Sequence, residues 1–153
     1  MISLPFRRSP QDPTIAGLYG MIVAQARAPA FYREYGVADT VSGRLDMIVL
    51  HLVLVMRRLA TVGAATTVGQ PLFDHFCKDI DANFREMGVG DLAVPKEMRR
   101  VAEAFYGRAK AYENALAASD REALDAAVGR NVFGLVRPHL GARRLARRRR
   151  SVF

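Results

Sequence analysis

The segment from Asp74 to Asp81 (DHFCKDID) carries the densest set of side chains that could do chemistry. At helical spacing, Asp74, Lys78 and Asp81 fall on one face, whereas His75 and Asp79 fall on another. Clustered carboxylates could hold Mg²⁺ between helices, as in enzymes that bind diphosphates. The same residues can also form ion pairs between successive turns of a solvated helix, and we favour this interpretation. A small helical Mg-dependent enzyme that uses Asp74, Asp79 and Asp81 stays open as an alternative.

The other candidate metal or haem ligands have no second ligand at a suitable spacing in the sequence. His51, inside the apolar run from 47 to 56, could ligate haem or a metal, but we predict a buried histidine hydrogen-bonded to one neighbour. His75 and Cys77 are two residues apart and would point to different faces of a helix. The sequence has no HExxH, CxxC or glycine-rich phosphate loop, and no serine placed at a strained turn beside a base. We therefore expect no catalytic residue, metal, cofactor or small-molecule substrate.

The positive charge is concentrated at the end of the chain. The net charge is +8, yet residues 137–153 contain seven arginines and no acidic side chain, so the rest of the chain is nearly neutral. Arginines in such a run bind phosphates of RNA or of anionic lipids. We predict a flexible tail that binds anionic surfaces through Arg143, Arg144, Arg147, Arg148, Arg149 and Arg150. An RNA- or ribosome-binding module that acts through this tail is the alternative function.

Composition and length fit one globular domain. Half of the 153 residues are apolar and a quarter are charged, and the single cysteine excludes a disulfide framework. The longest apolar run has ten residues, whereas a membrane-spanning helix needs about 20. No signal peptide is recognisable at the N-terminus. We expect a cytoplasmic protein that can also lie at the inner membrane as a peripheral protein.

Every long patterned segment has the helical period, which predicts an all-α protein. We expect one compact domain of about five to six helices at residues 1–136, followed by the arginine-rich tail at 137–153. The segment 41–61 is apolar nearly all round and should be the buried central helix. Ser119 to Glu122 matches a capping box that begins the last helix, and 63–70 reads as a loop. The predicted helices lie at 14–27, 41–61, 71–87, 95–116 and 119–130, with a short turn at 30–35.

Longer strings of residues are more specific than any of these single sites. Three ordered blocks contain ARAPAFY and GVADTVSGR with LHL and RRL (26–59), LFD with DIDANFREMGVGD (72–91), and VPK with FYGR and AY (94–112). These blocks are similar to those of the ubiquinol–cytochrome c chaperone family, over about residues 15–135. The absence of a mitochondrial presequence suggests a bacterial member.

The resemblance implies a non-catalytic assembly factor. Such a protein binds newly made cytochrome b and assists assembly of ubiquinol–cytochrome c reductase, and mitochondrial members act near the ribosomal tunnel exit. A membrane-protein client needs temporary cover for apolar surface, so we expect an exposed apolar groove between helices. Within the blocks, exposed-type residues at helix ends and connections are the predicted partner-binding residues: Arg27, Tyr32, Arg44, Asp46, Arg85, Glu86, Asp91, Lys96, Tyr106 and Arg108.

Overall fold

Helices form about four fifths of the backbone in the computed structural model, which describes residues 13–134. No strand occurs in that part of the chain, so the all-α prediction is confirmed. The predicted tail at 137–153 and its arginines lie outside the described residues. The elements are α1 (Pro13–Ala26), α2 (Pro29–Arg33), α3 (Val41–Thr61), the π-helical turn η1 (Ala65–Gly69), α4 (Gln70–Glu86), α5 (Val94–Ala117) and α6 (Arg121–Phe133).

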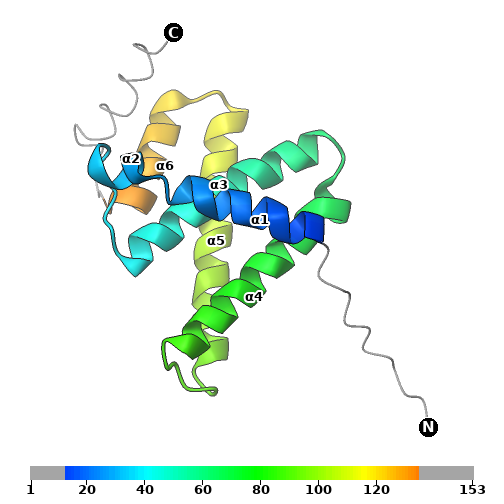
Figure 1. The fold of residues 1–153 in the computed structure, drawn as a ribbon. Helices are drawn as coiled ribbons and strands as arrows, with labels where there is room; N and C mark the ends of the chain where they lie inside the picture. The colour runs from blue at the N-terminus through cyan, green and yellow to red at the C-terminus, as the bar shows by residue number, and fades with distance from the viewer. Residues whose placement is uncertain (1–12, 135–153) are drawn as a thin grey trace.

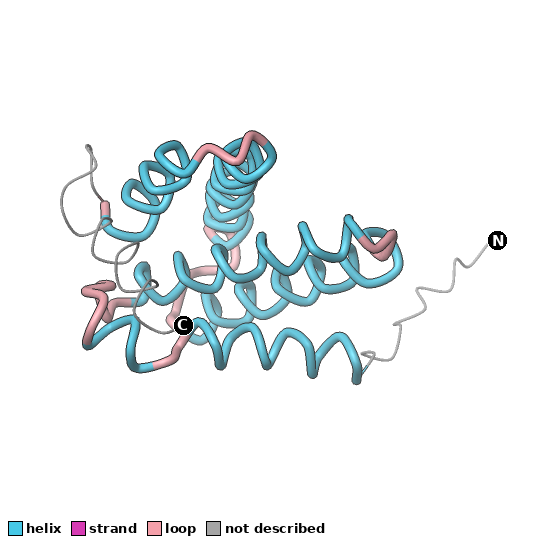
Figure 2. Tube along the Cα trace, turned by 90° about the horizontal axis from the view of Figure 1, so that it is seen from above, coloured by secondary structure: helices cyan, strands magenta, loops and turns pink. Residues whose placement is uncertain are grey.

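Helix α3 lies at the centre, between α1 on one side and the α5–α6 pair on the other (Figures 1 and 2). Its buried residues include Val49, Leu52 and Val53, which pack with Leu72 and Phe76 of α4 into one hydrophobic core. The far ends of α4 and α5 extend away from the remaining helices and are joined by the connection 87–93 (Figure 1). The central position of α3 agrees with the sequence prediction.

Helix α3 is not buried on all sides, however. Leu54 is 43% exposed, and Arg57 and Arg58 are exposed as well. His51 is half-buried rather than buried, which corrects the prediction. Its Nδ1 lies 2.8 Å from the carbonyl oxygen of Met47, and its ring packs edge-on against Phe31 with centroids 5.5 Å apart. A carbonyl only accepts hydrogen bonds, so Nδ1 carries the proton, and a hydrogen bond to a neighbouring group was expected.

Two local predictions were wrong. Asp120, not Ser119, caps α6: its Oδ1 accepts from the backbone N–H of Ala123 at 2.9 Å. Ser119 has a φ of 54° and belongs to the turn that ends α5, so it cannot occupy the extended backbone of a cap. The predicted loop at 63–70 contains η1, which leads directly into α4.

The start of α3 is fixed by a close contact that requires glycine. Thr40 caps the helix, and its Oγ1 accepts from the N–H of Gly43 at 3.0 Å. A Cβ on Gly43 would lie 2.0 Å from the carbonyl oxygen of Ala38, so only glycine lets residues 36–39 pass this close to the helix. None of the helices in residues 13–134 is both long enough and apolar enough to cross a membrane.

Candidate functional site

An apolar groove lies between α3 and α5. Its volume is about 420 Å³, and it is lined by Val53, Met56, Phe105, Tyr106, Ala109, Lys110 and Glu113. The lining residues of α5 recur at helical spacing and so fall on the face turned toward α3. Val53 and Phe105 are buried, Met56 is half-buried, and Tyr106 is 60% exposed. The groove therefore offers apolar surface to a partner, with two charged side chains among its lining residues.

Aromatic packing from α4 holds the groove wall in place. The ring of Phe73 lies 4.8 Å from that of Phe105 and 5.8 Å from that of Tyr106, centroid to centroid. Phe105 and Tyr106 also meet edge-on at 5.6 Å. Such contacts fix the Tyr106 ring while leaving much of it exposed. Tyr106 was among the predicted partner residues, whereas Phe73 was not predicted to belong to a site.

Two further predicted partner residues contact each other. Nη1 of Arg108 on α5 lies 2.8 Å from Oδ1 of Asp46 on α3, and the two side chains are only 21% and 14% exposed. Burial raises the pKa of Asp46, and the Arg108 guanidinium acts in the opposite direction. The pair joins the two helices that form the groove, so its first effect is to position them.

Three more predicted residues meet at a corner formed by α1, α2 and α3. Here the side chains of Arg27, Tyr32 and Arg44 line a hollow of about 290 Å³, together with Pro29, Arg33 and Asp39. The Tyr32 hydroxyl donates to the carbonyl oxygen of Ala26 at 2.9 Å, and burial raises its pKa. Nε of Arg44 donates to Oδ1 of Asp39 at 2.7 Å, and this bond lowers the pKa of Asp39. Arg33, on the short helix α2, was not among the predicted residues.

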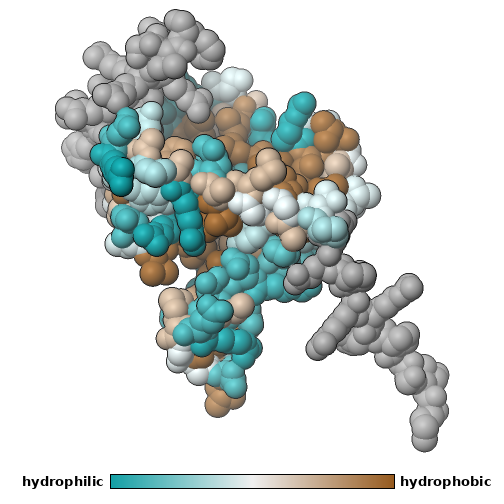
Figure 3. All heavy atoms as spheres, viewed as in Figure 1, coloured by the Kyte–Doolittle hydropathy of each residue, from teal (hydrophilic) through white to brown (hydrophobic). Residues whose placement is uncertain are grey.

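The last four predicted residues lie at the projecting end of α4 and α5. Arg85 bonds to Asp81 at 2.8 Å and to Asp91 at 2.5 Å, which ties the connection to α4. Glu86 and Lys96 are exposed. Hydrophobic atoms reach the surface at this tip (Figure 3), where Leu92 is 99% exposed. The ten predicted partner residues thus lie in separate places and do not form one surface.

The carboxylates of α4 do not converge on one point. Asp74 accepts from Gln70, and Asp81 accepts from Arg85. Asp79 accepts from the Tyr19 hydroxyl of α1 at 2.8 Å, and burial followed by this bond raises the pKa of Tyr19. No group of three or more potential ligands among residues 13–134 could hold a metal ion. The Mg²⁺ alternative therefore has no site in this part of the chain.

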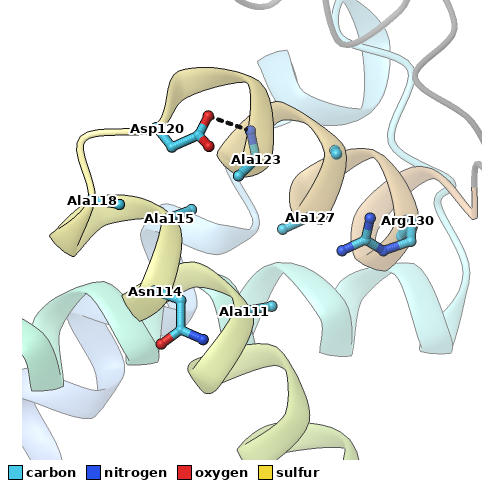
Figure 4. A pocket seen from close by; sticks show the side chains of 9 residues that line it. Ala111, Asn114, Ala115, Ala118, Asp120, Ala123, Ala127 and Arg130 are labelled. Atoms are coloured by element: carbon cyan, nitrogen blue, oxygen red, sulfur yellow. Dashed lines mark hydrogen bonds between the residues drawn. The ribbon is translucent and has the colours of Figure 1, made fainter.

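A second hollow, between α5 and α6, is lined mainly by alanines. It has a volume of about 410 Å³, and its polar lining residues are Asn114, Asp120 and Arg130 (Figure 4). The Asp120 carboxylate points to the N–H of Ala123, which it caps, as the dashed line in Figure 4 shows. This hollow was not predicted, because alanines at helical spacing indicate close helix packing as readily as an open surface.

Known proteins share both the sequence pattern and the fold. The model of the ubiquinol–cytochrome c chaperone family matches residues 33–148. It therefore begins later than the expected 15, leaves out the ARAPAFY string, and extends into the arginine-rich segment. The crystal structure of the Cbp3 homolog from Brucella abortus is similar, with 38% sequence identity and a TM-score of 0.72, over 89% of this chain and 76% of the other. A comparison with curated proteins gives no match. This chain belongs to the ubiquinol–cytochrome c chaperone family, and it is a chaperone or assembly factor for ubiquinol–cytochrome c reductase.

Proposed function

We propose that the chain binds newly made cytochrome b and covers part of its apolar surface through the α3–α5 groove. The observation that carries this proposal is the groove itself, which presents Tyr106 and Met56 beside the buried Phe105. The occupant would be a helical segment of the client that has not yet packed against its neighbours.

The side chains of the groove suit such a client. Methionine is flexible and polarisable, and it adapts to varied apolar partners. Tyrosine offers a large ring with one polar end and is enriched among the residues that dominate interface energetics. The rim residues Lys110 and Glu113 carry opposite charges, so they can orient a client segment without excluding either sign of charge.

The proposal requires a client that is released later. A groove of about 420 Å³ accepts a few side chains and not a whole helix, so the contact should be weak enough to exchange as the complex assembles. We propose that this binding occurs at the cytoplasmic face of the inner membrane, where the client is inserted. No catalytic step is needed for this role.

Two methionine substitutions test the proposal. Met56→Gln places an amide in the groove, whereas Met21→Gln makes the same change on α1 at a side chain that is 70% exposed and outside the groove. Both variants would be expressed with cytochrome b, and the amount of cytochrome b that copurifies would be measured. We expect Met56→Gln to reduce it several-fold and Met21→Gln to leave it unchanged, with both proteins folded by circular dichroism. Equal recovery with the two variants would overturn the groove as the client site.

A further inference from the structure

We infer that the corner hollow of α1, α2 and α3 is a binding site for a phosphate monoester. It is separate from the α3–α5 groove, so the inference does not depend on the proposed client. Helix α2 turns the chain from α1 to α3 at one end of the molecule (Figure 1). The residues that line the hollow belong to these helices and to the segments beside them.

The charge in this hollow is unbalanced. Three guanidinium groups, those of Arg27, Arg33 and Arg44, line it together with one carboxylate, that of Asp39. The carboxylate of Asp39 already forms an ion pair with Arg44. Within residues 13–134, neither Arg27 nor Arg33 forms an ion pair. The lining therefore carries a net charge of +2 in a concave place, with two arginines available to a ligand.

The backbone around the hollow is well fixed. The hydroxyl of Tyr32 is bonded to the end of α1, and the N–H of Val37 donates to the carbonyl oxygen of Phe31 at 3.0 Å. Val37 is buried, and the contact between Ala38 and Gly43 holds the following segment against α3. The arginines thus extend from elements whose relative positions are set before any ligand binds, which lowers the entropy cost of binding.

A phosphate monoester matches this site better than other anions. Guanidinium groups bind phosphate oxygens with paired N–H donors, and the fork geometry favours phosphate or carboxylate over spherical anions. A monoester carries between −1.5 and −2 charges at pH 7, close to the net charge of the lining, whereas a carboxylate or a phosphodiester carries one. The hollow of about 290 Å³ has room for the phosphate and a small carrier such as glycerol. Both a soluble metabolite and the headgroup of phosphatidic acid present this chemistry.

Glycerol 3-phosphate titrated into the full-length chain tests the site. We expect saturable shifts of the NMR signals from the Nε–H groups of Arg27 and Arg33. The affinity should rise from pH 5 to pH 7, because the ligand gains its second charge while the arginines stay charged. Dimethyl phosphate, a singly charged diester, should bind at least several-fold more weakly. The arginines of residues 137–153 are present in every sample, so the wild type and the variants differ only at the substituted position.

Charge-removing variants isolate the corner from the tail. We expect Arg27→Gln and Arg33→Gln each to lower the affinity for glycerol 3-phosphate about tenfold. Arg57→Gln removes one exposed arginine from α3 outside the hollow and should have no effect. Vesicles of phosphatidylcholine with and without phosphatidic acid separate the sources: displacement of the ligand by the acidic vesicles alone identifies a lipid headgroup, and no displacement identifies a soluble monoester. Equal affinity of the wild type and both corner variants, or tighter binding of a short RNA than of the monoester at the same arginines, would overturn the inference.

Discussion

Arg108 of α5 and Asp46 of α3 form an ion pair at 2.8 Å, with both side chains largely removed from solvent. The pair joins the two helices that border the apolar groove. Burial raises the pKa of Asp46 despite the neighbouring guanidinium, so removal from water outweighs the attraction of the arginine. This imbalance predicts that the two partners respond differently to substitution.

Arg108→Gln should destabilise the protein more than Asp46→Asn. The first leaves a charged carboxylate largely buried without its partner, at a cost of about 2 kcal/mol in the free energy of unfolding. The second removes that buried charge and leaves an arginine that can turn toward water, at a cost below about 1 kcal/mol. Urea denaturation of both single variants and of the double variant measures these changes in the free energy of unfolding. If Asp46→Asn were the more damaging change, the pair would be held mainly by mutual attraction.

The Arg108→Gln variant should become relatively more stable as the pH falls. Without the guanidinium, the folded-state pKa of Asp46 rises further above its unfolded value. A raised folded-state pKa contributes stability that is present below the unfolded pKa and is lost as the pH rises through the folded pKa. The deficit of the variant relative to wild type should therefore shrink between pH 7 and the ordinary aspartate range near pH 4. A deficit that stays constant over this range would exclude Asp46 as its source.

Two tyrosines offer a matched test of buried hydroxyl groups. The Tyr19 hydroxyl donates to Asp79 at 2.8 Å, so Tyr19→Phe should cost about 1–2 kcal/mol of stability. The Tyr112 hydroxyl is buried, and no group among residues 13–134 meets hydrogen-bond geometry with it; burial raises its pKa, and the nearby Asn131 side chain acts in the opposite direction. Tyr112→Phe should change stability by less than about 0.5 kcal/mol, because no hydrogen bond is lost. Thermal unfolding of both variants measures the two changes in stability. Equal losses of stability would show that the Tyr112 hydroxyl has a polar partner in solution.

Two glycines should respond to alanine in opposite directions. Gly43→Ala would place a methyl group against the Ala38 carbonyl and should lower stability by several kcal/mol. Gly107, inside α5, has no atom within 4 Å of an added Cβ, so Gly107→Ala should raise stability by about 0.5–1 kcal/mol through helix propensity. Melting temperatures of the Gly43→Ala and Gly107→Ala variants, measured by calorimetry and compared with that of the wild type, test both expectations. A tolerated Gly43→Ala would mean that residues 36–39 can move away from α3.

Local patterns in the sequence were sufficient to predict where the helices lie but not at which residues they begin and end. The apolar spacing in 41–61 predicted α3 because a continuous helical period is unambiguous over that length. Ser119 and Asp120 are both good caps, and the positive φ of Ser119, set by the turn after α5, decided between them. The segment 63–70 has no apolar period, so nothing in it indicated η1.

Most features of the site that could not be predicted from the sequence depend on contacts between segments that are distant in the chain. Asp46 and Arg108 were predicted to face a partner, since nothing local shows that α3 and α5 bring them together. The groove was expected, yet its position depends on which side of α3 remains uncovered. Tyr106 was identified through the family resemblance, whereas Phe73 acts through packing that only the fold reveals.

Site-specific photo-crosslinking tests most directly whether the α3–α5 groove binds cytochrome b. A photoreactive phenylalanine analogue would replace Tyr106 in the groove or, as the control, Met21 on α1, in cells that synthesise cytochrome b. We predict a covalent adduct with cytochrome b from position 106 and none from position 21, and we expect the adduct to decrease when Met56→Gln is added. An adduct from position 21 alone, or none from either position while cytochrome b still copurifies, would show that the client binds elsewhere on the chain.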